Sequence, residues 1–127
     1  MKKNLALLLC FFFGHAVFHF LAQSFAVLLP SIQQTFSVTP VQIGALITVR
    51  EIATGLISLP GGMLSDYFAK RRALLLSGCL LLYAIAWLLI GWAPYFAALS
   101  VGMVLIAAAS AVWHLPSLVE LGARFPD

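Results

Sequence analysis

The chain has 127 residues, of which 63% are hydrophobic and 9% charged, and its mean hydropathy is +1.07. A water-soluble domain of this size exposes too much surface for so few charges to cover, so most apolar side chains must face lipid. The net charge of +3 comes from small clusters of Lys and Arg, a pattern that suits membrane topology and not a nucleic-acid surface. The composition therefore excludes a soluble domain and predicts an integral membrane protein.

Four segments are long and apolar enough to cross a hydrocarbon core about 30 Å thick. They cover residues 5–29, 41–63, 73–90 and 95–118. The short connections between them predict antiparallel neighbouring helices.

Turn and cap residues separate these spans. Pro30 is expected to end the first span. Thr39 and Gln42 are expected to form a capping box around Pro40, which stands at the first helical position of the second span. Residues 91–94, Gly-Trp-Ala-Pro, predict the turn between the third and fourth spans.

Basic residues predict the orientation of the spans. The two connections expected on the outer side, residues 31–39 and 91–94, contain no Lys or Arg. The positive-inside rule therefore predicts a multi-pass protein of the inner (plasma) membrane with both termini in the cytoplasm. Every segment assigned to the cytoplasmic side carries positive charge: Lys2 and Lys3, residues 70–72, and Arg124.

The start of the chain also resembles a signal peptide. Its apolar run continues to Pro30, beyond a typical signal-peptide core, which favours an uncleaved first span. Leu9 stands where a small residue would precede a lipidated Cys10. Cys10 and Cys79 both lie inside apolar runs and are interpreted as small buried hydrophobic residues.

The connection between the second and third spans carries a motif. Residues 61–72 read Gly-Gly-Met-Leu-Ser-Asp-Tyr-Phe-Ala-Lys-Arg-Arg. This segment resembles the signature of the major facilitator superfamily, Gly-x-Leu-Ala-Asp-Arg-x-Gly-Arg-Lys, which that family carries in the same cytoplasmic loop. Tyr67 and Ala69 depart from the pattern, where Arg and Gly are usual. The matching positions are Gly62, Leu64, Asp66, Lys70 and Arg71.

The resemblance implies an all-α integral membrane fold, in which the four helices form part of the N-terminal six-helix half of a transporter bundle. It implies secondary active transport of a small solute by alternating access, with protons as a candidate coupling ion. Asp66, with Lys70 and Arg71, is assigned a gating role, Gly62 a close helix approach, and Arg72 only a topology role. Because the family has about twelve spans, the chain (residues 1–127 as one membrane segment) is expected to be an incomplete N-terminal part whose partners are the remaining helices.

Two further segments bear on the subtype. Residues 15–30 and 112–116 are similar to the fosmidomycin-resistance type of drug exporter, which implies efflux. Drug/proton antiporters usually carry an Arg within the fourth span, whereas residues 99–112 contain no basic residue. Residues 107–111, Ala-Ala-Ala-Ser-Ala, favour close helix packing instead.

Arg50 and Glu51 lie near the middle of the second span, where an ionisable group costs about 3 kcal/mol on insertion scales. Such a group usually faces a polar cavity or a partner, so both residues are candidates for the substrate or proton pathway. The alternative is an ion-pair network within the bundle. Neighbouring positions are rotated by about 100°, so these two side chains need not pair with each other. Glu51 is expected at the centre of one polar and small-residue face, formed with Gly44, Thr48, Gly55, Ser58 and Gly62.

His15, His19 and Gln23 repeat every four residues and share one face of the first span. They are the other candidates for the substrate or proton pathway, because His titrates near neutral pH, and the alternative is a polar helix contact. A metal site is not predicted, because this span offers no third ligand. His114 is interpreted as a gate or packing residue nearer the cytoplasm.

Other classes of function fit less well. No catalytic constellation is visible, so neither an enzyme nor a cofactor is expected. A dimeric four-span multidrug exporter would carry its working carboxylate in the first span, which has no acid. A haem-binding bundle would use His15 or His19 with His114, which the predicted spans place roughly 10 Å apart in depth.

Overall fold

The computed structural model describes residues 2–125, with side chains described from Leu5 onward. Over these residues the chain forms four long helices and one short 3₁₀ turn. In chain order these are α1 (Lys2–Phe36), α2 (Pro40–Tyr67), η1 (Ala69–Arg71), α3 (Arg72–Gly91) and α4 (Phe96–Arg124). All four long helices are long and apolar enough to cross a membrane, which confirms the four predicted spans.

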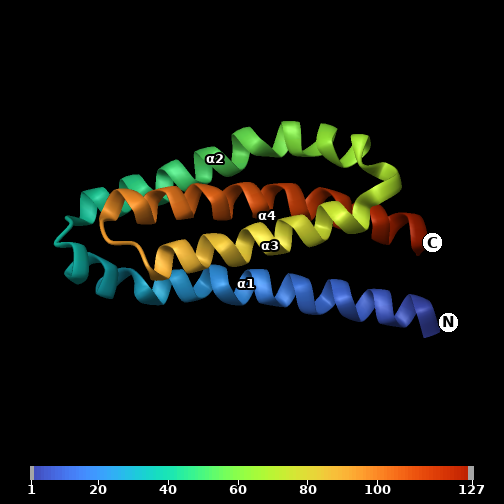
Figure 1. Cartoon of the computed structure of the whole chain (residues 1–127), viewed down its shortest axis with the longest axis horizontal. Coiled ribbons are helices and arrows are strands. Elements are labelled where there is room, and N and C mark those ends of the chain that lie inside the picture. The colour runs from blue at the N-terminus through green and yellow to red at the C-terminus, as the bar shows by residue number, and fades with distance from the viewer. Residues whose placement is uncertain (1, 126–127) are drawn as a thin grey trace.

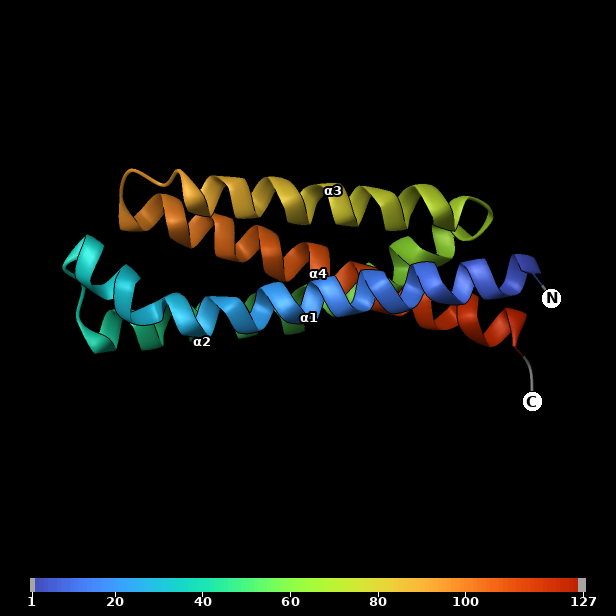
Figure 2. The same ribbon diagram turned by 90° about the horizontal axis from the view of Figure 1, so that it is seen from below.

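The helices run side by side in an antiparallel bundle (Figure 1). α4 lies at the centre, packed closely against α2 and α3, whereas α1 runs along one side with a thinner interface. Both described ends of the chain and the α2–α3 connection lie at the same end of the bundle (Figures 1 and 2). We call this the terminal end. All basic residues except Arg50 lie in the chain segments at this end: the start of α1, the α2–α3 connection with the start of α3, and the end of α4.

α1 does not end at Pro30, as the sequence predicted, but continues to Phe36. A proline inside a membrane-spanning helix removes one backbone hydrogen bond, and such helices tolerate that loss. Ser37, the first residue after the helix, terminates it with a left-handed φ of 50°. The amide of Ser37 donates to the carbonyl of Gln34 and that of Val38 to the carbonyl of Gln33, which is the pattern of a Schellman cap. The connection between α1 and α2 is therefore only residues 37–39, not residues 31–39.

The capping box at the start of α2 is confirmed. The backbone amide of Gln42 donates to Thr39 Oγ1 at 3.3 Å, and the Thr39 amide donates to Gln42 Oε1 at 2.8 Å. Pro40 occupies the first turn, where its missing amide hydrogen leaves no helical bond unmade. The first turn of α2 is thus stabilised by the residues that the sequence indicated.

Close helix contacts concentrate on α4, whose alanine-rich segment is confirmed as a packing surface. Ala107 and Ala109 are each 1% exposed. On α2 the close approach occurs at Gly61, where an added Cβ would stand 3.3 Å from a methyl group of Val112. Gly62 has more room and is only half-buried, so the predicted role of this glycine belongs to its neighbour.

The two cysteines differ in burial. Cys79 is buried in the α3–α4 interface, as predicted, but Cys10 is exposed, so its prediction was wrong. Most of α1 is exposed in the bundle, because a helix surrounded by lipid does not need to bury its apolar side chains. An apolar run in a membrane helix therefore does not indicate which residues lie inside the bundle.

Candidate functional site

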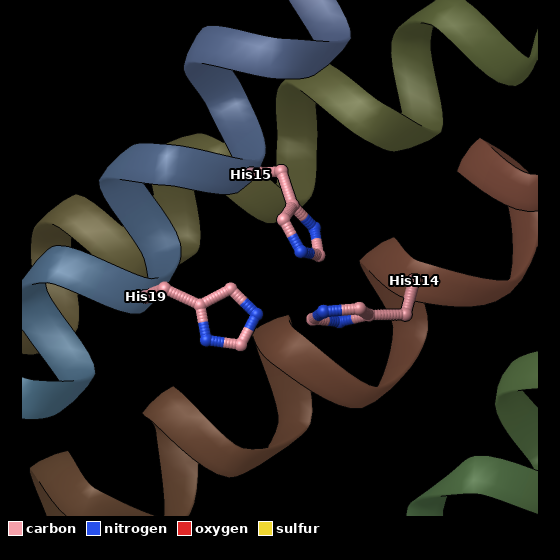
Figure 3. A group of neighbouring side chains, drawn as sticks. All are labelled: His15, His19 and His114. Carbon is pink, nitrogen blue, oxygen red and sulfur yellow. The ribbon is translucent and has the colours of Figure 1, made fainter.

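Three imidazole rings meet between α1 and α4. His15 and His19 project from α1 toward His114 of α4, and the three rings point toward one another (Figure 3). The ring centroids of His15 and His19 are 4.5 Å apart, and those of His15 and His114 are 5.4 Å apart. One ligand nitrogen from each ring lies within 4.8 Å of the others. We call this group the histidine cluster.

The ring of His114 lies 5.4 Å from that of His15 and 6.2 Å from that of His19, which corrects the predicted difference in depth of roughly 10 Å. The sequence prediction ended the fourth span at residue 118, whereas α4 continues to Arg124. His114 therefore lies ten residues from the end of its helix, comparable with the distance of His15 from the start of α1. The difference in depth, one argument against a haem site, is thus removed. The argument against a metal site was that the first span offers no third ligand, and His114 of α4 now supplies one.

An aromatic group sets the position of this part of α1. Phe18 is 3% exposed and packs on Tyr83 of α3 and Trp113 of α4, with ring centroids 4.2 Å and 4.8 Å away. The hydroxyl of Tyr83 donates a hydrogen bond of 3.1 Å to the backbone carbonyl of Phe18. Because Phe18 precedes His19, these contacts fix the rotation of α1 that presents the histidines to α4.

A pocket of about 350 Å³ lies between α1, α2 and α4, beside the histidine cluster. Its polar lining comes from all three helices: His19 and Gln23, Arg50, and Ser110 with His114. The sequence-predicted residues His19, Gln23, Arg50 and His114 are therefore brought together around one pocket. His15 contacts the other histidines but does not line it.

Arg50 and Glu51 form an ion pair, with Arg50 Nη1 and Glu51 Oε1 3.3 Å apart. The rotation between neighbouring positions meant that these residues need not pair, but their long side chains reach across it. The Arg50 side chain is 25% exposed, whereas that of Glu51 is 61% exposed and does not line the pocket. The Nε of Arg50 is buried and has no hydrogen-bond partner among the described residues. Arg50 lines the pocket, so its guanidinium charge can act on a ligand there.

The polar face of α2 that contains Glu51 is directed away from α4. The face that packs on the bundle is instead formed by Ile43, Leu46, Gly61 and Ser65. Sequence periodicity identified a coherent face but not the direction in which it points, because that depends on the helices packed around it.

The motif residues occupy the terminal end of α2 and the connection to α3. Asp66, Lys70 and Arg71 are exposed, and among the described residues they form no ion pair. Leu64 is 39% exposed. The predicted gating network is therefore not formed within this bundle.

A different charge network joins the helices at the terminal end. Glu120 of α4 accepts from Arg72 Nη1 at 3.4 Å and from Arg124 Nε at 2.6 Å. Arg72, interpreted from sequence as a topology marker only, thus connects α3 with α4. Glu120 was not predicted from sequence as a partner of these arginines, although residues four apart on a helix, such as Glu120 and Arg124, often form an ion pair.

Four helices that are each long and apolar enough to cross a membrane define a polytopic membrane bundle. A family model described as Major Facilitator Superfamily matches residues 11–126. The chain therefore belongs to the Major Facilitator Superfamily, whose members are membrane transporters. Searches of curated proteins and of solved structures found no match.

Proposed function

We propose that this chain takes part in secondary active transport of a small solute by alternating access, and that the pocket between α1, α2 and α4 belongs to the solute pathway. The observation that carries this proposal is the position of Arg50, a cationic side chain within an apolar helix, on a pocket that His19, Gln23 and His114 also line. A charged group at this depth is costly without a partner, and a solute with acceptor groups would interact with the guanidinium. An anionic solute fits best, because it would also meet the guanidinium charge.

Glu51 has a different place in the proposal. Its carboxylate forms the ion pair with Arg50 and is exposed on α2. It is therefore available to take up a proton, or to pair with another residue, when further helices of the transporter move against this face. The imidazoles of His15 and His19 supply further groups beside the pocket that can accept a proton. Protons are the coupling ion that this set of residues supports.

The polar face of α2 and the exposed motif also support a larger assembly. Asp66, Lys70 and Arg71 project outward at the terminal end, available to a partner helix that they could latch in one conformation. The four helices then act as part of an N-terminal six-helix half, and the motif as a gate between this half and further helices. Membership of the family supports this assembly.

Orientation follows from charge. Except for Arg50, the basic residues lie at the terminal end, which the positive-inside rule assigns to the cytoplasmic face of the inner membrane. The direction of transport is proposed as efflux, because residues 15–30 and 112–116 are similar to fosmidomycin-resistance exporters. A reporter protein that works only in the cytoplasm should be active when it is fused after Arg124. Activity of a reporter that works only in the periplasm, fused at the same position, would reverse this orientation.

The proposal is tested in everted membrane vesicles from cells that express the encoding gene. Energised vesicles are offered a panel of labelled organic anions that includes the phosphonate fosmidomycin. We expect uptake of at least one anion, its collapse with a protonophore, and at least a tenfold loss in the Arg50→Ala variant and in the Glu51→Gln variant.

The matched control is Leu56→Ala on the same helix, at a position that is 70% exposed and outside the pocket. This variant should transport like the wild type. Wild-type uptake by both Arg50→Ala and Glu51→Gln would refute the assignment of the pocket. If neither the wild type nor any variant takes up any of the anions, the proposed substrate class is refuted.

A further inference from the structure

The chain contains three histidines, and all three belong to the histidine cluster. From their convergence we propose that His15, His19 and His114 form a binding site for a divalent transition-metal ion of the zinc type. This inference goes beyond the proposed transport function, and the binding it predicts is measured without a transport assay.

The geometry is that of an incomplete tetrahedral site. His15 and His19, four residues apart, project from one face of a helix, a spacing that lets two imidazoles share one ion. A zinc ion holds imidazole nitrogens at about 2.0–2.1 Å, so nitrogens at two corners of a tetrahedron are about 3.3 Å apart. The three candidate nitrogens lie within 4.8 Å of one another. Small rotations of the side chains close this difference without moving a helix.

The hydrogen bonding of His114 provides an independent observation. Its Nδ1 lies 2.7 Å from the backbone carbonyl oxygen of Ser110. A carbonyl oxygen accepts only, so Nδ1 carries the hydrogen and the neutral ring keeps its lone pair on Nε2. Metal-binding histidines almost always donate their second nitrogen to a carbonyl or carboxylate in this way, which fixes the tautomer and aims the ring.

The donor set selects the class of metal. Three neutral imidazoles without a carboxylate suit zinc, copper, nickel or cobalt and disfavour magnesium and calcium, which prefer oxygen ligands. A haem is disfavoured, because the third imidazole stands where the macrocycle between the other two would lie. The fourth position would face the pocket that His19 and His114 line. Arg50 lines the same pocket, so an anion or water suits that position better than another cation.

A bound ion would also join two helices whose interface is thin. α1 meets α4 over a much smaller surface than α2 or α3 does. Two ligands from α1 and one from α4 would hold these helices together, and the thermal stability of the chain should rise when the ion binds.

The test uses the full chain, purified through a tag without histidine and placed in lipid nanodiscs. Cobalt(II) is the spectroscopic probe, because tetrahedral coordination gives intense visible bands, and zinc is the competitor. We expect one cobalt per chain with tetrahedral bands, displacement by zinc, and a rise in the thermal midpoint. His15→Ala and His19→Ala should each weaken binding at least tenfold, and neither removes core packing because both residues are exposed.

Controls separate this site from other metal ligands. Cys10→Ser removes an exposed thiol outside the cluster and should leave cobalt binding unchanged. Circular dichroism of every variant verifies that the helices remain. The proposal is overturned if cobalt remains octahedral and weakly bound in the wild type, or if folded His15→Ala and His19→Ala variants bind as tightly as the wild type. A Soret band in the purified protein would overturn it in favour of haem.

Discussion

The hydroxyl of Tyr83 on α3 donates a hydrogen bond of 3.1 Å to the backbone carbonyl of Phe18 on α1, 65 residues earlier in the chain. Tyr83 is 3% exposed, and its ring also packs on the ring of Phe18. α1 otherwise makes few close contacts with the bundle. Together with the packing of Phe18 on Trp113, this pair of residues holds α1 at the rotation at which its histidines meet α4.

Removing that hydroxyl should loosen α1 selectively. Tyr83→Phe keeps the ring packing and loses one hydrogen bond, which we expect to lower the free energy of unfolding by about 1 kcal/mol. Hydrogen exchange measured by mass spectrometry should show faster exchange in residues 15–22 and little change in α4. Tyr95→Phe, at a position 62% exposed, is the control. Equal exchange in α1 of both variants would contradict the role of the Tyr83 hydroxyl.

Gly102 should be the glycine least tolerant of a side chain. An added Cβ there would stand 2.6 Å from a side-chain carbon of Ile90 and 3.2 Å from the carbonyl oxygen of Ala86. Gly102→Ala is expected to destabilise the bundle by about 1–2 kcal/mol, because overpacking exceeds the gain in helix propensity.

The matched control is Gly78→Ala on α3, where an added Cβ meets nothing within 4 Å. Without a clash, the same replacement should be neutral or slightly stabilising. Unfolding of both variants is followed by circular dichroism during titration with a denaturing detergent. If Gly102→Ala is as stable as Gly78→Ala, the close contact between α3 and α4 is not present.

Glu120 should matter for stability at the terminal end. Its side chain is 18% exposed and accepts from two arginines, so Glu120→Gln weakens both pairs. We expect a loss of about 1 kcal/mol, most of it from the pair with Arg72, because Arg124 is 52% exposed and more strongly screened by solvent. A double-mutant cycle with Arg72→Met, measured at low and high salt, gives the coupling energy. A coupling with Arg124 larger than that with Arg72 would reverse this ranking.

The capping box at the start of α2, predicted from sequence and confirmed by the structure, should contribute to stability. Thr39→Ala removes the side-chain oxygen that accepts from the amide of Gln42, and should destabilise the start of α2 by about 1 kcal/mol. Thr35→Ala, near the end of α1, should have little effect, since that threonine is exposed and caps no helix. The difference between the two variants in a detergent unfolding titration checks the cap, and a similar effect of both would contradict it.

The local features of the fold could be predicted from sequence because their causes are local. Hydropathy depends on composition over one span, and the capping box depends on Thr39 and Gln42 alone. Pro30 shows where a local rule fails, since a proline that ends helices in water is tolerated in a long apolar helix.

The site was predictable only in part, because its geometry depends on how helices align. His15, His19 and Gln23 share a face by periodicity alone. The level of His114 depends on how far α4 extends past its apolar residues, to Arg124, and hydropathy does not report that length. Arg50 faces the pocket and Glu51 does not, because the direction of each face of α2 is set by α4.

The central claim is that the pocket between α1, α2 and α4 is a polar, solute-accessible pathway in the membrane. Thiol accessibility tests it most directly, in a background that carries Cys10→Ser and Cys79→Ala. The pocket residue Gln23 is replaced by Cys in one variant, and Leu81, which is 63% exposed on α3 and outside the pocket, in another. Both variants, in native membranes, are exposed to a charged, membrane-impermeant thiol reagent. The account predicts rapid modification of the Gln23→Cys variant and none of the Leu81→Cys variant, whereas an unreactive Gln23→Cys variant, or equal reaction of both, would contradict it.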